Sequence, residues 1–416
     1  MVAMIFWQAP ILQAFSPSHP TRSFHHESTS LCMAAATKKK KKKGGKQGGG
    51  GGGLKGFGSV SSKSSNKKTV ELDRSKAALA FYDFLEKDMC SDTLKGCGMA
   101  YFEDGIRGVV ARKNFVKGDV MIRIPYETAL NLGPEGTDPT LAAVTLLKKY
   151  CRVLGSSNDD SSNNNNDQQY QSYLELLPPF LGEDCRGSTD FFSDEALEAL
   201  QYPPMVDETL LRRKACQARF DADITADVLW LDDSPVTVQH LQWAVWLVTS
   251  RVLTVQGAEN STSSSSSSRL LIPFLDMCNH NRNSPHVLTG RAVGGGNLKV
   301  VAGGPVTKGD PIEIGYGGGM AGNDRFLQDY GFLDDFSNDD RAYTMVAQQV
   351  LGNRRAGALQ PLSAADRNRV LEALESTSIE QDEELLKACT DRQLSSAYQY
   401  RIGVKRALQK LQPQAQ

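Results

Sequence analysis

Hydrophobic residues recur along this chain at different spacings, and the spacing predicts which segments form helices and which form strands. Hydrophobic residues three and four positions apart are typical of an amphipathic helix, whereas short alternating runs bounded by Gly, Pro, Asn or Asp are typical of strands. Helices are expected at 72–89, 139–154, 207–229, 238–253, 359–374, 384–394 and 398–411. Strands are expected across the turn-containing stretch 99–111 and at 120–125, 287–293, 297–302 and 311–316. The chain should therefore combine short strand pairs with helical stretches between and after them.

The first 70 residues lack this pattern, and we expect them not to fold. They contain twelve basic side chains and one acidic one, with a lysine run at Lys38–Lys43 and a glycine run around Gly48–Gly53. Such a segment buries too little apolar surface to offset its chain entropy. An acid-poor, Ser-rich N-terminus with a short apolar start resembles a two-part plastid presequence, which predicts a chloroplast or plastid location. The alternatives are an untargeted tail in the cytoplasm or a nuclear signal formed by the lysines.

The charge balance and the cysteines exclude several classes of function. Residues 71–416 carry 35 basic and 47 acidic side chains, so this part is acidic although the whole chain has a net charge of −1. We therefore expect no nucleic-acid partner. The eight cysteines include no Cys-x-x-Cys pair, which argues against a zinc site and suits buried thiols in a reducing compartment. No apolar run approaches the roughly 20 residues that span a bilayer, so no membrane span is expected.

Two segments between Arg269 and Asp335 concentrate the residues that could carry chemistry. The first is Leu-Ile-Pro-Phe-Leu-Asp-Met-Cys-Asn-His, ending at His280, and it predicts a buried strand or turn that delivers an acid, an amide and an imidazole to one place. The second begins with Glu-Ile-Gly-Tyr-Gly and predicts a short strand ending in Tyr316, followed by glycines that permit close backbone approach. The glycines at 315–319 do not predict a phosphate loop, because no Lys-Ser or Lys-Thr follows and no parallel βαβ pattern surrounds them.

Together with Tyr-Gly-Phe at 330–332, these segments resemble the SET-domain protein methyltransferases, in particular the class that includes the Rubisco large-subunit lysine methyltransferase and the actin-histidine methyltransferase. The phrase Tyr-Leu-Glu-Leu-Leu-Pro at 173–178 resembles the helical insert of that class. The resemblance implies a mixed α+β fold, namely a mostly-β SET fold of small sheets with a pseudoknot, a helical insert and a short helical C-terminal part. It implies a SET domain at 71–335 with the insert near 139–235, and a reduced substrate-binding region at 336–416.

The resemblance also implies an activity, the S-adenosyl-L-methionine-dependent transfer of methyl groups to a protein lysine side chain. No metal is implied, and we expect a monomer that acts on a protein substrate. Tyr316 matches the catalytic tyrosine. The positions that match cofactor contacts are Asp104, Gly105, Ile106, Arg251, Asn279, His280, Tyr330, Gly331 and Phe332. The positions that match substrate contacts are Arg251, Leu253, Asp276, Tyr316 and Tyr330.

Several of these residues also have a purely structural interpretation. Tyr316 could be a core tyrosine, His280 a buried histidine with satisfied hydrogen bonds, and Asp276 a carboxylate that caps the next turn. At Leu253 the histidine-modifying relative has asparagine and the Rubisco-type enzyme an aromatic residue, so protein-histidine methylation stays open. A SET-fold module that binds protein without catalysis is a further alternative. We favour the enzyme, because the tyrosines, asparagine and histidine of the site are all present.

Overall fold

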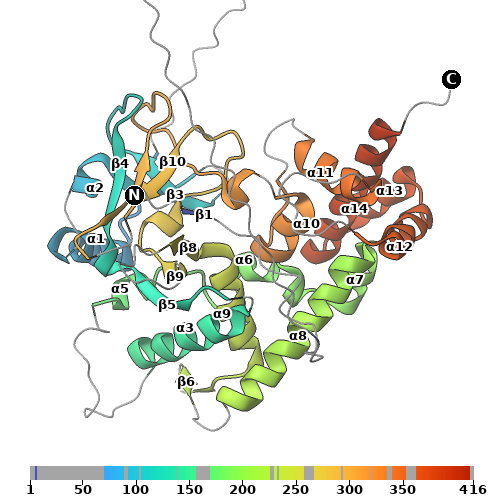
Figure 1. Cartoon of the computed structure of the whole chain (residues 1–416), viewed down its shortest axis with the longest axis horizontal. Helices are drawn as coiled ribbons and strands as arrows, with labels where there is room; N and C mark the ends of the chain where they lie inside the picture. Colours follow the sequence, from blue (N-terminus) through green and yellow to red (C-terminus); the bar gives the residue numbers. More distant parts are fainter. Residues whose placement is uncertain are drawn as a thin grey trace, which may run out of the picture. The chain divides into compact units, whose positions relative to one another are not determined.

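The computed structural model describes most of the chain from Val70 onwards (Figure 1). The described residues are 70–88, 92–102, 105–136, 138–155, 169–224, 229–231, 234–256, 267–291, 294–319, 321–334, 340–352 and 362–412, together with strand β1 at Ile5–Phe6. Apart from β1, the expected presequence with its lysine and glycine runs lies outside the described residues. The plastid location therefore stays a prediction.

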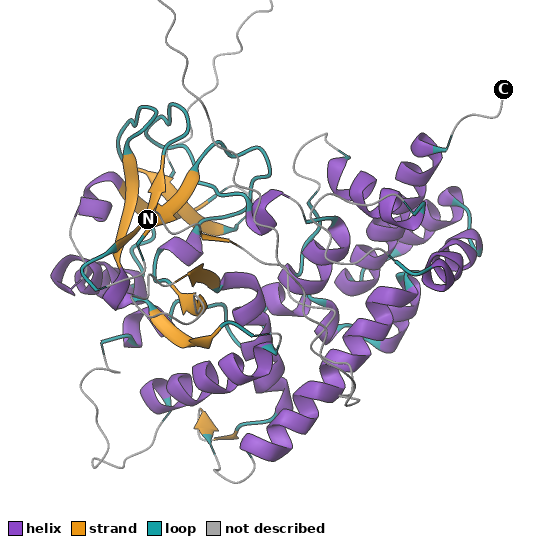
Figure 2. Ribbon diagram, viewed as in Figure 1, coloured by secondary structure: helices purple, strands orange, loops and turns teal. Residues whose placement is uncertain are grey.

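Small antiparallel sheets form the β part of the molecule, as Figure 2 shows. The strands are β2 (Cys97–Tyr101), β3 (Arg107–Ala111), β4 (Val120–Pro125), β5 (Leu130–Pro134), β6 (Trp230–Leu231), β7 (Ser234–Pro235), β8 (Leu253–Gln256), β9 (Ser267–Leu271), β10 (Val287–Gly290) and β11 (Asn297–Val301). β2 pairs with β3 and β6 with β7, while two larger sheets have the strand orders β10-β11-β4 and β1-β8-β9-β5. The hairpin predicted across 99–111 and the strand pair predicted across 287–302 are both present.

Helices connect several of the strands in these sheets. They are α1 (Lys76–Asp88), α2 (Asp92–Gly96), α3 (Pro139–Leu154), α5 (Gln171–Leu174), α6 (Glu183–Arg186), α7 (Asp194–Ala199), α8 (Pro203–Asp223) and α9 (Val238–Arg251). Ser193 caps α7, since its Oγ accepts a hydrogen bond from the backbone N–H of Ala196 at 3.1 Å. Helix α3 packs against α9, where the ring of Tyr150 meets the buried ring of Trp243 edge-on at 4.9 Å. None of the described helices combines the length and hydrophobicity needed to cross a membrane.

The C-terminal helices share a hydrophobic core with the helical insert. They are α11 (Arg341–Val350), α12 (Ala364–Glu375), α13 (Ile379–Ala388) and α14 (Arg392–Leu411). α14 packs against α7 and α12 against α8 (Figure 1). Tyr400 of α14 is fully buried and meets Tyr202, which precedes α8, edge-on at 5.7 Å. The insert therefore stands between the C-terminal helices and the sheets, whose own core contains Phe81, Trp243 and Phe274.

Some predicted boundaries are wrong for local reasons. The predicted helix 384–394 is in fact the end of α13 and the start of α14, because Asp391 caps a new helix by accepting the Leu394 N–H at 2.9 Å. The predicted helix 207–229 starts earlier, with Pro203 in the first turn of α8, and ends at Asp223. The segment 311–316 is not a regular strand, since it makes only isolated bridges to its neighbours.

These isolated bridges place two distant segments side by side. On one side of segment 311–316, the Ile312 N–H donates to the Val109 carbonyl of β3 at 2.8 Å. On the other side, the Ile314 N–H donates to the Asn279 carbonyl at 2.9 Å, and the Asn281 N–H donates back to Ile314 at 3.0 Å. The Asn-His segment and the tyrosine segment therefore run parallel and in contact.

Candidate active site

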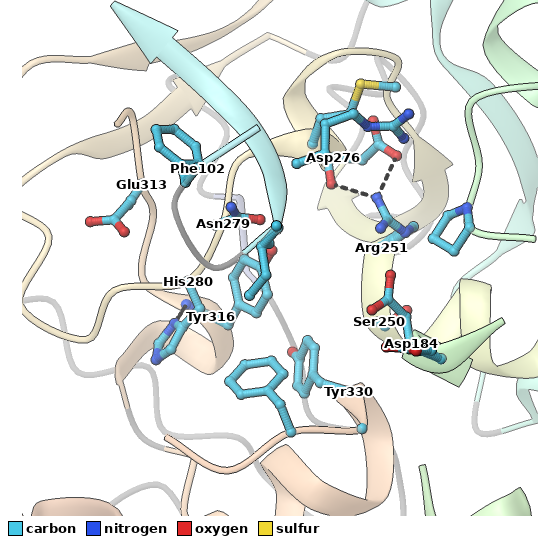
Figure 3. Close-up of a pocket in the computed structure, with 18 of the residues that line it drawn as sticks. Phe102, Asp184, Ser250, Arg251, Asp276, Asn279, His280, Glu313, Tyr316 and Tyr330 are labelled. Atoms are coloured by element: carbon cyan, nitrogen blue, oxygen red, sulfur yellow. Dashed lines mark hydrogen bonds and ion pairs between the residues drawn. The ribbon is translucent and has the colours of Figure 1, made fainter. Parts of the chain in front are cut away.

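A cavity of about 1110 Å³ opens beside these two segments (Figure 3). Its walls come from the β2–β3 hairpin, the helical insert, the end of α9 and the residues that follow Asn323. The predicted site residues that line it are Gly105, Ile106, Arg251, Asp276, Asn279, His280, Tyr316, Tyr330, Gly331 and Phe332. The fold thus collects residues from five separate parts of the sequence around one space.

Tyr316 is fixed at both its backbone and its hydroxyl. Its N–H donates to Nδ1 of His280 at 3.0 Å, and its hydroxyl donates to the carbonyl of Cys278 at 2.6 Å. Its ring stacks on that of Tyr330, with centroids 5.1 Å apart and an angle of 26°. Burial raises the pKa of Tyr316, so the hydroxyl stays protonated through the physiological range. The side chain of Tyr316 therefore lines the cavity as a neutral phenol of fixed orientation.

His280 joins the two segments to the stretch after Phe332. Because its Nδ1 accepts the Tyr316 N–H, the ring proton of the neutral form lies on Nε2. That Nε2 faces Oδ2 of Asp334 at 3.5 Å, and Nε of Arg282 donates to the same oxygen at 2.7 Å. Burial works against the charge on Asp334, but hydrogen bonding and charge from His280 and Arg282 outweigh it and lower the pKa of this carboxyl. The Asp334 carboxylate therefore orients His280, and His280 in turn orients the backbone of Tyr316.

Asp276 and Arg251 form a polar pair at another wall of the cavity, where Figure 3 shows them joined by dashed lines. Nη1 of Arg251 lies 3.1 Å from the Asp276 carbonyl and 3.5 Å from its Oδ2. The hydroxyl of Tyr173 donates to the same Oδ2 at 2.9 Å. Burial raises the pKa of Asp276, while Arg251 and Tyr173 act in the opposite direction. Sequence reasoning did not assign Tyr173 to the site, although it noted the phrase that this residue opens.

The closing aromatic segment is held by an unusual helical turn. Residues Phe326–Tyr330 form a π-helix that ends at Gly331, whose φ of 86° favours glycine. A Cβ at Gly331 would lie 2.7 Å from the carbonyl of Asp184 in the insert, so a side chain is also excluded by space. The rings of Phe326 and Phe332 lie 4.6 Å and 6.1 Å from that of His280. This turn packs the aromatic rings together beside the two parallel segments that contain His280 and Tyr316.

The fold of this site matches that of solved structures. The SET domain of LSMT bound to lysine and AdoHcy aligns with a TM-score of 0.53 at 18% identity, covering 82% of this chain and 90% of that chain. The same domain bound to methyllysine and AdoHcy aligns with a TM-score of 0.54 at 17% identity, covering 82% and 91%. Rubisco LSMT bound to AdoMet aligns with a TM-score of 0.52 at 18% identity, covering 81% and 90%.

The chain has the SET fold. The predicted fold class, a mixed α+β SET fold with helical additions, is therefore confirmed. No protein-family model matches the chain, and no curated protein sequence does so either. Structural similarity thus identifies the fold where sequence comparison does not.

The two remaining predicted site residues, Asp104 and Leu253, have different outcomes in this SET fold. Asp104 lies outside the described residues, and of its turn the structure describes Gly105, with a φ of 78°, and the exposed Ile106. Leu253 is 1% exposed and does not line the cavity, so its assignment to the substrate site is corrected. It is the first residue of β8, pairs with Leu270 of β9, and belongs to the hydrophobic core beneath the sheet.

Charged residues of the insert form ion pairs with the π-helix and with Arg325 just before it. The sequence analysis did not predict these contacts. Arg212 of α8 lies between Asp190 and Asp329, with nitrogen–oxygen distances of 3.0 Å and 2.7 Å. Arg325 forms a two-pronged pair with Glu208 of α8 at 2.9 Å and 2.8 Å. All these side chains are at least four-fifths buried. Since Asp329 directly precedes Tyr330, the network connects the insert to the wall of the cavity.

No cluster of three or more His, Cys, Asp or Glu side chains within the described residues has the arrangement of a metal site. The described cysteines Cys97, Cys151, Cys185, Cys216 and Cys278 are buried free thiols, and Cys389 is partly exposed. Burial raises the pKa of Cys97 to about 12, so this thiol is protonated and inert at neutral pH. The described side chains that line the cavity include phenols, carboxylates, amides, an imidazole and guanidinium groups.

Proposed function

We propose that this protein is an S-adenosylmethionine-dependent methyltransferase that modifies a lysine side chain of another protein. The observation that carries the proposal is the position of Tyr316. Its phenol, held to the Cys278 carbonyl at 2.6 Å, shares one cavity with Asn279 and His280, in a SET fold. Two of the structural neighbours are bound to lysine or methyllysine together with AdoHcy, which supports lysine as the target.

The residues of the cavity fit S-adenosylmethionine. A space of about 1110 Å³ can contain a nucleoside cofactor and the end of a substrate side chain together. No described residue hydrogen-bonds the side-chain amide of Asn279, which is therefore available for the polar groups of the cofactor. The rings of His280 and Phe332 offer flat apolar surface to an adenine, and Arg251 suits a carboxylate. When bound, the cofactor supplies a methyl group activated by its positively charged sulfur.

The chain's own groups would orient the acceptor and keep it uncharged. A lysine amine has to lose its proton before it can attack, and a dry cavity disfavours the ammonium form. The half-buried ring of Tyr316 and the buried ring of Tyr330 would limit the access of water, while the phenol of Tyr316 would present its oxygen atom to the reacting groups. Alignment of acceptor and donor then accounts for most of the rate, because little acid–base chemistry is needed.

Identification of the methylated amino acid tests this proposal. The purified chain would be incubated with methyl-labelled S-adenosylmethionine and a plastid or whole-cell protein extract, and the labelled proteins would be hydrolysed to amino acids. We expect labelled methyl-lysine that is absent from a parallel reaction with the Tyr316→Phe variant. Labelled methyl-histidine would move the assignment to the histidine-modifying alternative. An absence of label from every extract would favour a non-catalytic binding module.

The Asn279→Ala substitution should weaken cofactor binding about tenfold. The amide lines the cavity, and loss of one hydrogen bond to a buried polar ligand costs roughly 1–1.5 kcal/mol. Titration calorimetry with S-adenosylhomocysteine measures this affinity without catalysis. The exposed Asn131, whose side chain accepts a hydrogen bond from the nearby Gly133 N–H, supplies the matched control Asn131→Ala. Equal affinity of the Asn279 and Asn131 variants would remove Asn279 from the cofactor site.

A further inference from the structure

The segment Tyr173–Pro178 of the insert is fastened to the site by side chains from three directions. Arg107 and Trp243 donate hydrogen bonds to two of its backbone carbonyls, and so fix the segment as a wall of the cavity. The third bond differs, because here the segment itself donates: the hydroxyl of Tyr173 reaches Oδ2 of Asp276 at 2.9 Å. Of these three contacts, the Tyr173 bond is the one that reaches a carboxylate lining the cavity.

The two oxygen atoms of the Asp276 carboxylate differ in their hydrogen bonding. Its side chain is 1% exposed, and its Oδ2 is engaged by Tyr173 and, at 3.5 Å, by Arg251. Its Oδ1 has no hydrogen-bond partner among the described residues, although Asp276 lines the cavity. The charged groups that face this carboxyl are Arg251 from α9 and Arg107 from β3. Since a buried carboxylate oxygen without a donor is costly, a ligand that donates a hydrogen bond there would be favoured.

We propose that Tyr173 is a positioning residue, whose hydroxyl holds Oδ2 of Asp276 and thereby leaves Oδ1 for a hydrogen bond from the target amine. This inference rests on the proposed function of the same cavity. Tyr173 can act as a rigid support because it is fully buried and its ring packs on Phe81, with centroids 5.7 Å apart. Arg251 has 21% of its side chain exposed and a longer contact, so it restrains the carboxylate less closely.

The Tyr173 hydroxyl also bears on the charge of Asp276. Burial already raises the pKa of this carboxyl, and a donor to its ionised form counteracts that rise. Removing the hydroxyl should therefore raise the pKa further, so that a larger fraction of Asp276 is protonated near neutrality. A protonated carboxyl is a weaker hydrogen-bond acceptor than a carboxylate, so it holds the target amine less well. Activity should then be lost at a higher pH as the solution is acidified.

A direct test follows the carboxyl of Asp276 itself. NMR titration of protein labelled with ¹³C at the aspartate carboxyl, with the Asp276 signal assigned from Asp276→Asn, measures this pKa. We expect Tyr173→Phe to raise it by about one unit. The control is Tyr170→Phe, because Tyr170 is a buried tyrosine in the same stretch that packs on Phe84 rather than on the site. An unchanged Asp276 pKa in Tyr173→Phe would overturn the proposal.

The kinetic arm separates this inference from the proposed function. The initial rate of methyl-lysine formation at limiting protein extract follows kcat/KM and would be measured from pH 6 to 9. Tyr173→Phe should lower it about tenfold at pH 7 and move the acidic limb up by about one unit, with cofactor affinity unchanged within twofold. Asp276→Asn should remove the contribution of Asp276 to this limb and leave the contribution of the target amine, and adding Tyr173→Phe should then change neither the rate nor the limb. A limb that Tyr173→Phe still moves in the Asp276→Asn background, or additive losses in the double variant, would contradict the positioning role. A parent protein that forms no methyl-lysine would refute the proposed function, while the NMR titration would still decide whether Tyr173 controls Asp276.

Discussion

Replacement of Tyr316 by phenylalanine is expected to lower the rate of methyl transfer about 100-fold while changing cofactor affinity less than threefold. The substitution keeps the ring that stacks on Tyr330 and removes only the hydroxyl that donates to the Cys278 carbonyl. A preorganised polar group that acts on the reacting atoms typically contributes 10²–10³-fold to a rate, because it needs no reorientation during the reaction. Single-turnover methylation and calorimetric titration with S-adenosylhomocysteine measure the two quantities separately.

Tyr126→Phe is the matched control for this substitution. Tyr126 is partly buried against the same hydrophobic core but does not line the cavity, so its variant should retain full activity. If Tyr316→Phe methylated as fast as the parent protein, Tyr316 would be a structural tyrosine. If cofactor affinity fell as much as the rate, the hydroxyl would bind the cofactor without a specific role in transfer.

Much of the candidate site could be predicted because it lies in short segments with dense chemistry. His280 and Tyr316 are 36 positions apart, yet each follows an apolar run that had to be buried. Their ring centroids lie 5.1 Å apart in the structure. The fold needed the resemblance to known SET domains, since hydrophobic spacing alone gives helices and strands but does not specify how isolated bridges pair.

The residues that were missed are single polar side chains on otherwise ordinary helical segments. Tyr173 meets Asp276 across 103 positions, and Arg212 meets Asp329 across 117. Nothing in the local sequence separates Arg212, which is 7% exposed, from the charged residues around it on α8. Leu253 shows the converse error, because one position in a strand decides whether a side chain faces the core or the site. Such contacts depend on how the insert packs, which local spacing does not determine.

The largest loss of stability is expected from Arg212→Met, which should lower the free energy of unfolding by about 3–5 kcal/mol. The parent guanidinium lies between the carboxylates of Asp190 and Asp329, both nearly or fully buried. Without it, the two carboxyl groups keep only the weaker influence of Arg213 and Arg325, and the turn that carries Tyr330 loses one of its ion pairs with the insert. Urea denaturation, followed by the shift of the midpoint at an unchanged slope, measures the loss.

Arg369→Met provides the control, since Arg369 also pairs with α8, through Asp207 at 2.8 Å, but with about half of each side chain exposed. Its loss should cost less than about 1 kcal/mol.

The pH dependence of the stability lost in Arg212→Met shows whether charge or packing causes the loss. Burial already raises the pKa of Asp190 and Asp329 in the parent protein, and Arg212 opposes that rise.

In Arg212→Met the folded-state pKa of both carboxyls should rise further above the unfolded value of about 3.9. Between these values the folded state binds more protons than the unfolded state, so the stability of the variant decreases as the pH rises through this window. The difference from the parent protein should therefore be larger at pH 8 than at pH 5. A loss of stability that is equal at both pH values would show that Arg212 acts through packing of its side chain, because a packing defect does not titrate.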